Sequence, residues 1–232
     1  MPSGPPNNFT GTDTSQTIQG SLAVLDDGSG SFGQVTVQGV NAMNGDPTPM
    51  DLGMTAWTFD ATGVTGTKLT TGGTVYLSAF WIRANTPVSK LAGKLQHTVT
   101  TAGATLTAAQ NFVGVYTAQA LLDGTATGAR IGVSADQSGV WTTAGTYQPA
   151  LTWYSNGAIL IPGQYWAAVI TNGTTQPTFR VSGGDIPAIN GNLATAFLRA
   201  AVNGTGATSL AASVTPSSNS AANAAYFYAA LF

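Results

Sequence analysis

Turn signals that contain glycine recur at short intervals along this sequence, and they constrain the fold more than any other feature. They separate runs rich in Thr, Val, Tyr, Phe and Trp, and lie at Thr71–Gly73, Asp123-Gly124, Asn156-Gly157, Asn172-Gly173, Gly183-Gly184 and Asn203-Gly204. Such runs suit pleated, half-buried surfaces, and no window holds a sustained helical spacing of apolar residues with charged residues opposite. Many short strands between regularly spaced turns are typical of a β-sandwich or barrel.

The predicted fold class is therefore all-β: a jelly-roll-type β-sandwich over residues 63–232, preceded by an extended N-terminal arm. The expected strands are 73–84, 93–101, 111–118, 129–134, 150–154, 164–171, 178–182, 195–202, 209–214 and 224–232. Pro162-Gly163 predicts a tight turn before the strand 164–171, because Pro fixes φ and Gly adopts the positive φ of a type II turn.

Two of the expected strands are apolar on both faces. They read VYLSAFWI (75–82) and AAYFYAALF (224–232). One face of each would pack on the opposite sheet, and the other face needs a further partner. We expect a neighbouring subunit to supply it.

Charged residues make up only 7% of the chain, where a soluble surface usually carries about 25–35%. The polar surface must then consist of Thr, Ser, Asn and Gln, and neutral polar surfaces repel one another weakly. Together with the two-sided strands, this scarcity of charge predicts a homo-oligomer.

Several partners and sites are excluded by composition. A net charge of −2 with seven Lys and Arg argues against a phosphate-binding track, so no nucleic-acid partner is expected. Without cysteine there is no disulfide or thiolate metal site. No apolar run approaches the ~18–20 residues that cross a bilayer, so no membrane partner is expected. The start, MPSGPPNNFTGTD, lacks the basic and apolar regions of a secretory signal.

Residues 1–62 differ from the rest. Pro and Gly cluster in PSGPP, two short alternating segments, SLAVL and SFGQVTVQGV, lie around the run DDGSG, and NAMNGDPTPMDLG follows. These pieces are too short to bury a core alone. We expect an attachment arm that gains order against sister subunits or a docking surface.

Catalytic residue types are scarce. A Ser-His-Asp triad has to use His97, the one histidine, and no GxSxG-like nucleophile turn is present. We interpret His97 as an exposed strand residue. The nine acids are all Asp, and several fall in predicted turns, among them Asp46, Asp123, Asp136 and Asp185. Paired carboxylates hydrolyse glycosides, but Asp that bonds its own backbone explains these positions without chemistry. No catalytic residue is predicted.

Metal and modification signals are weak. The run DDGSGS (Asp26–Ser31) lacks the alternating acids and terminal Glu of an EF-hand loop, so we interpret it as a glycine-rich hairpin turn. We therefore expect no metal and no cofactor. Asn-x-Thr sequons occur at Asn8, Asn172 and Asn203, and the last two are Asn-Gly turns followed by Thr.

Four aromatic residues of the middle segment fall on or beside predicted loops: Trp141, Tyr147, Trp153 and Tyr154. Exposed aromatic rings stack on the C–H faces of pyranose sugars. These four are the candidate glycan contacts, and core or interface packing is the alternative interpretation.

Three motifs follow one another in GARIGVSADQSGVWTTAGTYQPALTW (Gly128–Trp153) and ILIPGQYWAAVITNGTTQPTF (Ile159–Phe179): an ADQS…W loop, a PGxYW turn and strand, and an NGTTxPTF hairpin. The C-terminal SLAASVTPSSNSAANAAYFYAALF follows them. In this order they resemble the β-sandwich domain of minor tail proteins and related virion appendages in phages of actinobacteria. The resemblance covers residues 67–232, and the arm shares only the general style of phage attachment segments.

This resemblance implies a trimer that decorates a phage tail, baseplate or capsid, with residues 1–62 bound to other virion proteins. It implies a virion location after assembly in the host cytoplasm, which needs no signal peptide. Some such domains bind host-surface glycans, but no motif here transfers a binding residue. The sequence therefore favours a structural virion protein over a stand-alone carbohydrate-binding module or adhesin, and favours both over a glycan-cleaving enzyme.

Overall fold

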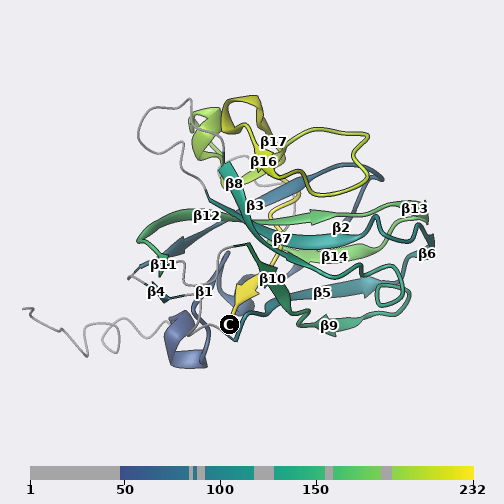
Figure 1. The fold of residues 1–232 in the computed structure, drawn as a ribbon, viewed down its shortest axis with the longest axis horizontal. Helices are drawn as coiled ribbons and strands as arrows, with labels where there is room; N and C mark the ends of the chain where they lie inside the picture. Colours follow the sequence, from purple (N-terminus) through teal and green to yellow (C-terminus); the bar gives the residue numbers. More distant parts are fainter. Residues whose placement is uncertain (1–47, 84–85, 88–91, 118–127, 155–158, 184–189) are drawn as a thin grey trace, which may run out of the picture. The chain divides into compact units, whose positions relative to one another are not determined.

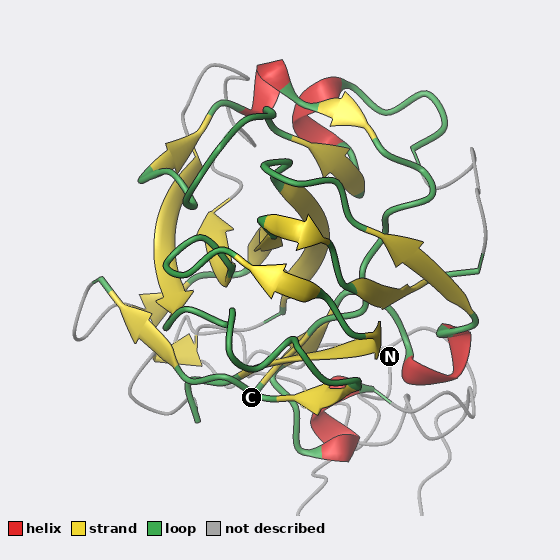
Figure 2. Cartoon of the chain, turned by 90° about the vertical axis from the view of Figure 1, so that its right-hand side faces the viewer, coloured by secondary structure: helices red, strands yellow, loops and turns green. Residues whose placement is uncertain are grey.

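The computed structural model describes residues 48–83, 86–87, 92–117, 128–154, 159–183 and 190–232 (Figure 1). They form antiparallel strands joined by loops and short 3₁₀ turns (Figure 2). The predicted all-β sandwich is thus confirmed. In this part of the chain no helix has the length and apolar character to cross a membrane. The 3₁₀ turns are η1 (Pro49–Leu52), η2 (Ala61–Gly63), η6 (Thr195–Phe197) and η7 (Pro216–Ser218).

The first sheet has the order β1-β18-β5-β14-β2, with β9 also paired to β5. We call it sheet one. Its strands are β1 (Ala56–Trp57), β18 (Ala230–Leu231), β5 (Leu95–Thr101), β14 (Thr178–Val181), β2 (Gly66–Leu69) and β9 (Gly145–Tyr147).

The second sheet, sheet two, has the order β10-β8-β7-β12-β3-β15-β17, with β16 also paired to β8. Its strands are β10 (Leu151–Trp153), β8 (Gly128–Ser134), β7 (Phe112–Thr117), β12 (Gly163–Ile170), β3 (Tyr76–Ile82), β15 (Ala200–Val202), β17 (Ser220–Ala221) and β16 (Ser213–Val214). Two further ribbons pair β11 (Ile159–Leu160) with β4 (Thr86–Pro87), and β13 (Gly173–Thr175) with β6 (Ala104–Leu106).

The main strand pairs are nested in sequence. β2 pairs with β14, β3 with β12, β5 with β9, and β7 with β8. Each pair encloses the next, and successive pairs alternate between sheet one and sheet two. Neighbours in space are therefore far apart in the chain, a topology that folds slowly because long loops must close before the strands pair.

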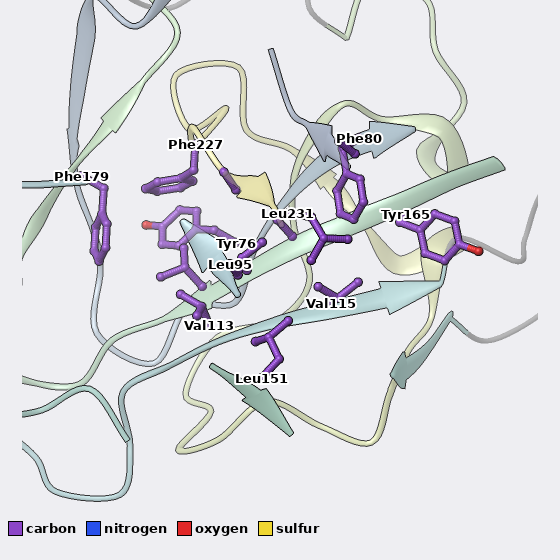
Figure 3. Packing of buried hydrophobic residues seen from close by; sticks show 14 of the residues in the cluster. Tyr76, Phe80, Leu95, Val113, Val115, Leu151, Tyr165, Phe179, Phe227 and Leu231 are labelled. Carbon is purple, nitrogen blue, oxygen red and sulfur yellow. The ribbon is translucent and has the colours of Figure 1, made fainter. Parts of the chain in front are cut away.

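The main core lies between the two sheets. Alternate residues of β3 point inward, and Tyr76 meets Phe227 with ring centroids 5.2 Å apart. At the other end Phe80 stacks on Tyr165 of β12 at 5.8 Å. Figure 3 shows these two aromatic groups, with aliphatic side chains between them. Period-two alternation thus explains half of the apolar residues in β3 and β12.

The other half form a second cluster, and this corrects the expectation that a neighbouring subunit covers the outer face. Leu77 and Ala79 of β3 and Trp166 of β12 are buried on the outer face of sheet two by the same chain. Between β15, which pairs with β3, and β16, which pairs with β8, residues 203–212 cross that face. We call them the outer strap. Its Leu210 is fully buried and lies against Gly114, where an added Cβ would come within 2.8 Å of the Leu210 side chain.

Hydrogen bonds tie the outer strap to the sheet beneath it. Tyr116 Oη donates to the carbonyl of Ala211 at 2.6 Å, and Arg130 Nη1 donates to the carbonyl of Leu210. Such bonds satisfy strap carbonyls that burial would otherwise leave unpaired. Burial raises the pKa of Tyr116, so its hydroxyl stays a donor across the ordinary pH range.

The outer face of the C-terminal segment is also covered within the chain. Phe59 packs on Tyr226 and Tyr228 with centroid distances of 5.0 and 5.7 Å. Thr58 Oγ1 donates to the carbonyl of Phe227 at 2.9 Å, and β1 pairs with β18. Residues 48–62, placed in the arm by sequence, therefore contribute a strand to sheet one. Residues 1–47 lie outside the described part.

Differences from the expected strands are local. β12 starts at Gly163, which pairs with Ile82 and has φ 157°, so the expected type II turn at Pro162-Gly163 is wrong. The expected strand 195–202 begins with η6 and is a strand only from Ala200. The expected strand 209–214 is a strand only in β16, and the expected strand 224–232 only in β18. The unexpected strands β1, β2, β4, β6, β9, β11, β13 and β17 have two to four residues each. Segments so short are strands because a partner lies beside them, not because of their own propensity.

The outer strap predicts a measurable stability cost. Leu210→Ala should lower the free energy of unfolding by about 2–5 kcal/mol, because the strap cannot collapse into the cavity without losing its bonds to Tyr116 and Arg130. Leu193→Ala, at an exposed leucine of the same C-terminal region, should change it by less than about 0.5 kcal/mol. Urea denaturation followed by circular dichroism measures both. Equal effects would mean that the strap does not pack on sheet two.

Candidate functional site

The ADQS…W motif links its own loop to the loop that contains Asn111. The backbone N–H of Gln137 donates to the carbonyl of Asn111 at 2.8 Å, and the N–H of Asn111 donates to Asp136 Oδ1 at 3.1 Å. The turn that follows is closed by the backbone N–H of Trp141, which donates to the carbonyl of Gln137 at 2.9 Å. This geometry directs the indole of Trp141 into the core.

Trp141 is fully buried, so its ring offers no face to a ligand in this structure. Its Nε1–H donates to Nε2 of His97 at 2.8 Å, and its ring meets Phe179 edge-on at 5.1 Å. Of the two interpretations given above for Trp141, the structure shows core packing.

His97 corrects the expectation of an exposed strand histidine. Leu95, His97 and Val99 share the inward face of β5, and His97 is 4% exposed. Desolvation lowers the pKa of His97 to about 4, against a smaller opposing effect of the Leu95 carbonyl. The period-two pattern LQHTVTT could have indicated this, because it places His97 in line with two apolar residues.

The other three candidates do not form one surface. Tyr147 is on β9 of sheet one, half-buried, with its hydroxyl on the carbonyl of Thr143 at 2.9 Å. Trp153 is on β10 of sheet two and half-buried against the main core, with Gly132 beneath its ring. Tyr154 is 54% exposed, and the guanidinium of Arg130 lies 4.8 Å from its ring centre. Tyr154 alone therefore presents a largely open ring.

An exposed aromatic residue outside the candidate set lies on β3. Trp81 is 36% exposed, and the guanidinium of Arg199 is 5.8 Å from its ring centre. Gln164 lies opposite Trp81 in the register of β12 and β3. No sequence signal points to this arrangement, because Trp81 lies inside an apolar run that is typical of a core strand.

The described aspartates stabilise turns. Partial burial of Asp136 raises its pKa, but hydrogen bonds from the Ser138 side chain and from backbone N–H groups outweigh this and hold the pKa below its usual value. Asp60 caps η2 through the N–H of Thr62 at 2.6 Å, and Asp51 accepts the N–H of Thr48 at 2.8 Å. The hydrogen bonds that Asp51 accepts from the Thr48 N–H and the Thr48 hydroxyl lower the pKa of Asp51. Asp46, Asp123 and Asp185 lie outside the described residues, as does the run Asp26–Ser31.

Two of the sequon asparagines are held in the fold by their amides. Asn172 Nδ2 donates to the carbonyls of Ala207 and Gln110 at 3.0 and 3.3 Å. Asn203 Nδ2 donates to Asn219 Oδ1 at 2.7 Å. An amide nitrogen engaged in this way is a structural tie rather than an open acceptor for a sugar. Asn8 lies outside the described residues.

The outer face of sheet one carries neutral polar pairs. Thr98 and Thr146 share a hydroxyl hydrogen bond of 3.0 Å, and Gln148 Nε2 donates to Gln96 Oε1 at 2.7 Å. Cross-strand pairs of this kind stabilise a sheet without charge. These pairs give the face hydrogen-bonding groups, and Arg180 of β14, between the inward Phe179 and Val181, adds a positive charge to it.

Comparison with known proteins adds no relative. No family model matches the chain, and no curated protein matches its sequence. Among the described residues, no group of three or more His, Cys, Asp or Glu side chains is placed to hold a metal ion.

Asn172 provides a test of the amide ties. Asn172→Asp should lower the free energy of unfolding by about 2–4 kcal/mol, because a carboxylate would face two carbonyl oxygens that now accept N–H bonds. Asn192→Asp, at an exposed asparagine, is the matched control and should stay within about 0.5 kcal/mol of the wild type. Thermal and urea unfolding measure both variants. If Asn172→Asp is as stable as the control, the Asn172 amide does not stabilise the fold.

Proposed function

We propose that this chain is a structural virion protein of a tailed phage: a minor tail protein, fibre or capsid decoration that assembles as a homotrimer and carries an attachment arm in the part of residues 1–62 that precedes β1. One observation carries the proposal. The motif residues that resemble the actinobacterial phage appendage domain are the residues that hold this sandwich together.

Each motif has such a role. In the ADQS…W loop, Asp136 and Gln137 bind the loop at Asn111, and Trp141 fills the core. In PGQYW, Tyr165 enters the main core and Trp166 enters the outer cluster. In NGTTQPTF, Asn172 ties the outer strap. Motifs of this kind mark a shared fold, and a fold is what an appendage family has in common when its partners vary.

The nested strand order supports the finer fold assignment. Pairs β2·β14, β3·β12, β5·β9 and β7·β8 alternate between the two sheets, and we assign this order to the jelly-roll class of double-sheet folds. Jelly rolls are frequent in viral capsid proteins, so the assignment agrees with a virion role.

A structural role is also supported by how the reactive side chains are used. The imidazole of His97 lies in the core, and the described aspartates bond their own turns. A glycan-cleaving enzyme needs two carboxyl groups that face a substrate. The carboxylates of Asp51, Asp60 and Asp136 instead accept hydrogen bonds from backbone N–H groups of the protein.

Support for the trimer comes from the surface and no longer from the two-sided strands, which the chain covers itself. The scarcity of charge remains. Large apolar side chains are also exposed, among them Met50 at 77% and Leu69 at 57%. A coat of this kind favours association.

The trimer is testable in solution. Multi-angle light scattering on the full-length protein at micromolar concentration should give about three times the 23.5 kDa chain mass. A stable monomer across the concentration range would contradict the oligomer. Antibody labelling of intact phage particles in electron microscopy tests the virion location, and particles without label would contradict it.

A second candidate function, a carbohydrate-binding module or adhesin, is favoured by Tyr154. Its open ring backed by Arg130 is a stacking surface with a hydrogen-bond donor beside it. Tyr154→Ala should then abolish retention on host cell-wall polysaccharide while circular dichroism stays unchanged. Thr152→Ala is the control, because Thr152 is exposed on β10, the strand that ends just before Tyr154. This variant should be retained on the polysaccharide. No retention of the wild-type protein would remove this candidate.

A further inference from the structure

The contact between His97 and Trp141 permits a single protonation state of the imidazole. An indole N–H only donates, so Nε2 of His97, 2.8 Å away, must be an acceptor without a proton. The proton of the neutral ring is then on Nδ1, which lies 3.4 Å from the carbonyl of Leu95. A second proton on Nε2 would place two N–H donors face to face in the core.

We propose that this hydrogen bond is an acid-sensitive latch, which holds the segment Asp136–Tyr147 closed on the sandwich and opens when His97 becomes doubly protonated. The segment joins β8 to β10 along the chain and includes β9, which pairs with β5 alone. Opening removes Trp141 from the core and exposes the β5 edge that β9 occupies.

Among the described residues around His97 no carboxylate faces the ring, and the Leu95 carbonyl only partly offsets the cost of burying a charge there. Trp141, Phe179 and Tyr147 approach it with centroid distances of 5.5, 5.8 and 6.0 Å. A cavity of about 20 Å³ beside it is lined mainly by apolar side chains from β5, β7, β12 and β14 and by Phe227 and Tyr228. The titratable residues beside the ring or this cavity are thus Tyr147 of β9 and Tyr228 of the C-terminal segment, whose ring packs outward on Phe59. Neither phenol supplies a carboxylate to pair with an imidazolium.

The latch segment has few other attachments, so it can open without the rest. Beyond the short β9 ladder, the N–H of Gly103 donates to the carbonyl of Trp141 at 2.9 Å, and Asn111 is bound by Asp136 and Gln137. By contrast, β12 is paired along most of its length on both sides, with β3 and β7. Segments with small interfaces open locally at lower cost than the central strands.

The direction with pH follows from the buried state. Burial lowers the pKa of His97 from 6.5 to about 4 in the closed form, whereas a solvent-exposed ring in the open form keeps its ordinary value. Above pH 6.5 the ring is neutral in both forms and the latch stays closed. As the pH falls from 6.5 to 4, the open form takes up the proton first, so the opening equilibrium rises with each unit. At pH 5 it should be about 30-fold larger than at pH 7.5.

Hydrogen exchange on the full-length protein tests the latch. After correction for the intrinsic pH dependence of exchange, peptides covering 136–147 should lose about 30-fold protection between pH 7.5 and pH 5. At both pH values they should exchange faster than peptides covering β12, whose amides need a larger opening. In His97→Gln the loss should disappear, because a glutamine amide oxygen accepts the same indole N–H and does not titrate in this range.

Three results would overturn the proposal: unchanged protection of 136–147, protection of 136–147 as high as that of β12 at pH 7.5, or the same loss in His97→Gln. If His97→Gln does not fold, the wild-type protein still decides. Nitrogen NMR at pH 7.5 should show the Nδ1–H tautomer of His97, and the Nε2–H tautomer would rule the latch out.

Discussion

The structure depends on the pairing of β3 with β12 at the centre of sheet two, because both strands are apolar on both faces. A sheet of this kind needs two covers. Sheet one supplies the inner cover, and the outer strap supplies the other, with Leu210 on Gly114 and the Asn172 amide on Ala207. The strap can cross the sheet because β15 and β16 pair with strands on opposite sides of β12. The topology of the C-terminal quarter therefore serves to bury one face of a single strand pair.

Neutral hydrogen bonds do the work that ion pairs and charged surfaces do in most proteins. Amides of Asn111, Asn172 and Asn203 tie loops together, and threonine and glutamine pairs cover the outer face of sheet one. Such bonds depend little on salt, whereas ion pairs weaken as salt screens them. They also leave the surface with little electrostatic repulsion, which agrees with the proposed homotrimer. His97 is the exception in this core, because a second proton on its ring would be an unpaired charge among neutral hydrogen bonds.

The conclusions about function follow from where the reactive groups are placed. Trp141 and His97, the residues best suited to binding or catalysis by type, are paired in the core, and the described aspartates close turns. The open aromatic rings, Tyr154 and Trp81, each lie beside an arginine on sheet two. Within the described residues, the open rings available for a ligand contact are thus Tyr154, one of the four aromatics that the sequence suggested, and Trp81, which it did not. The proposed virion appendage would need only its surface to meet a partner.

The sequence by itself determined the all-β class and the main strands, because glycine turns and β-branched runs act within a few residues. It also determined that the apolar segments 75–82 and 224–232 need cover on both faces. Only the tertiary structure decided what covers them, since the outer strap and Phe59 reach those faces through pairing between distant segments. The same reason applies to His97 and Trp141: alternation along β5 indicates an inward histidine, but its partner arrives from a loop more than forty residues away. Local patterns fix which side a residue faces, and long-range closure fixes what it meets there.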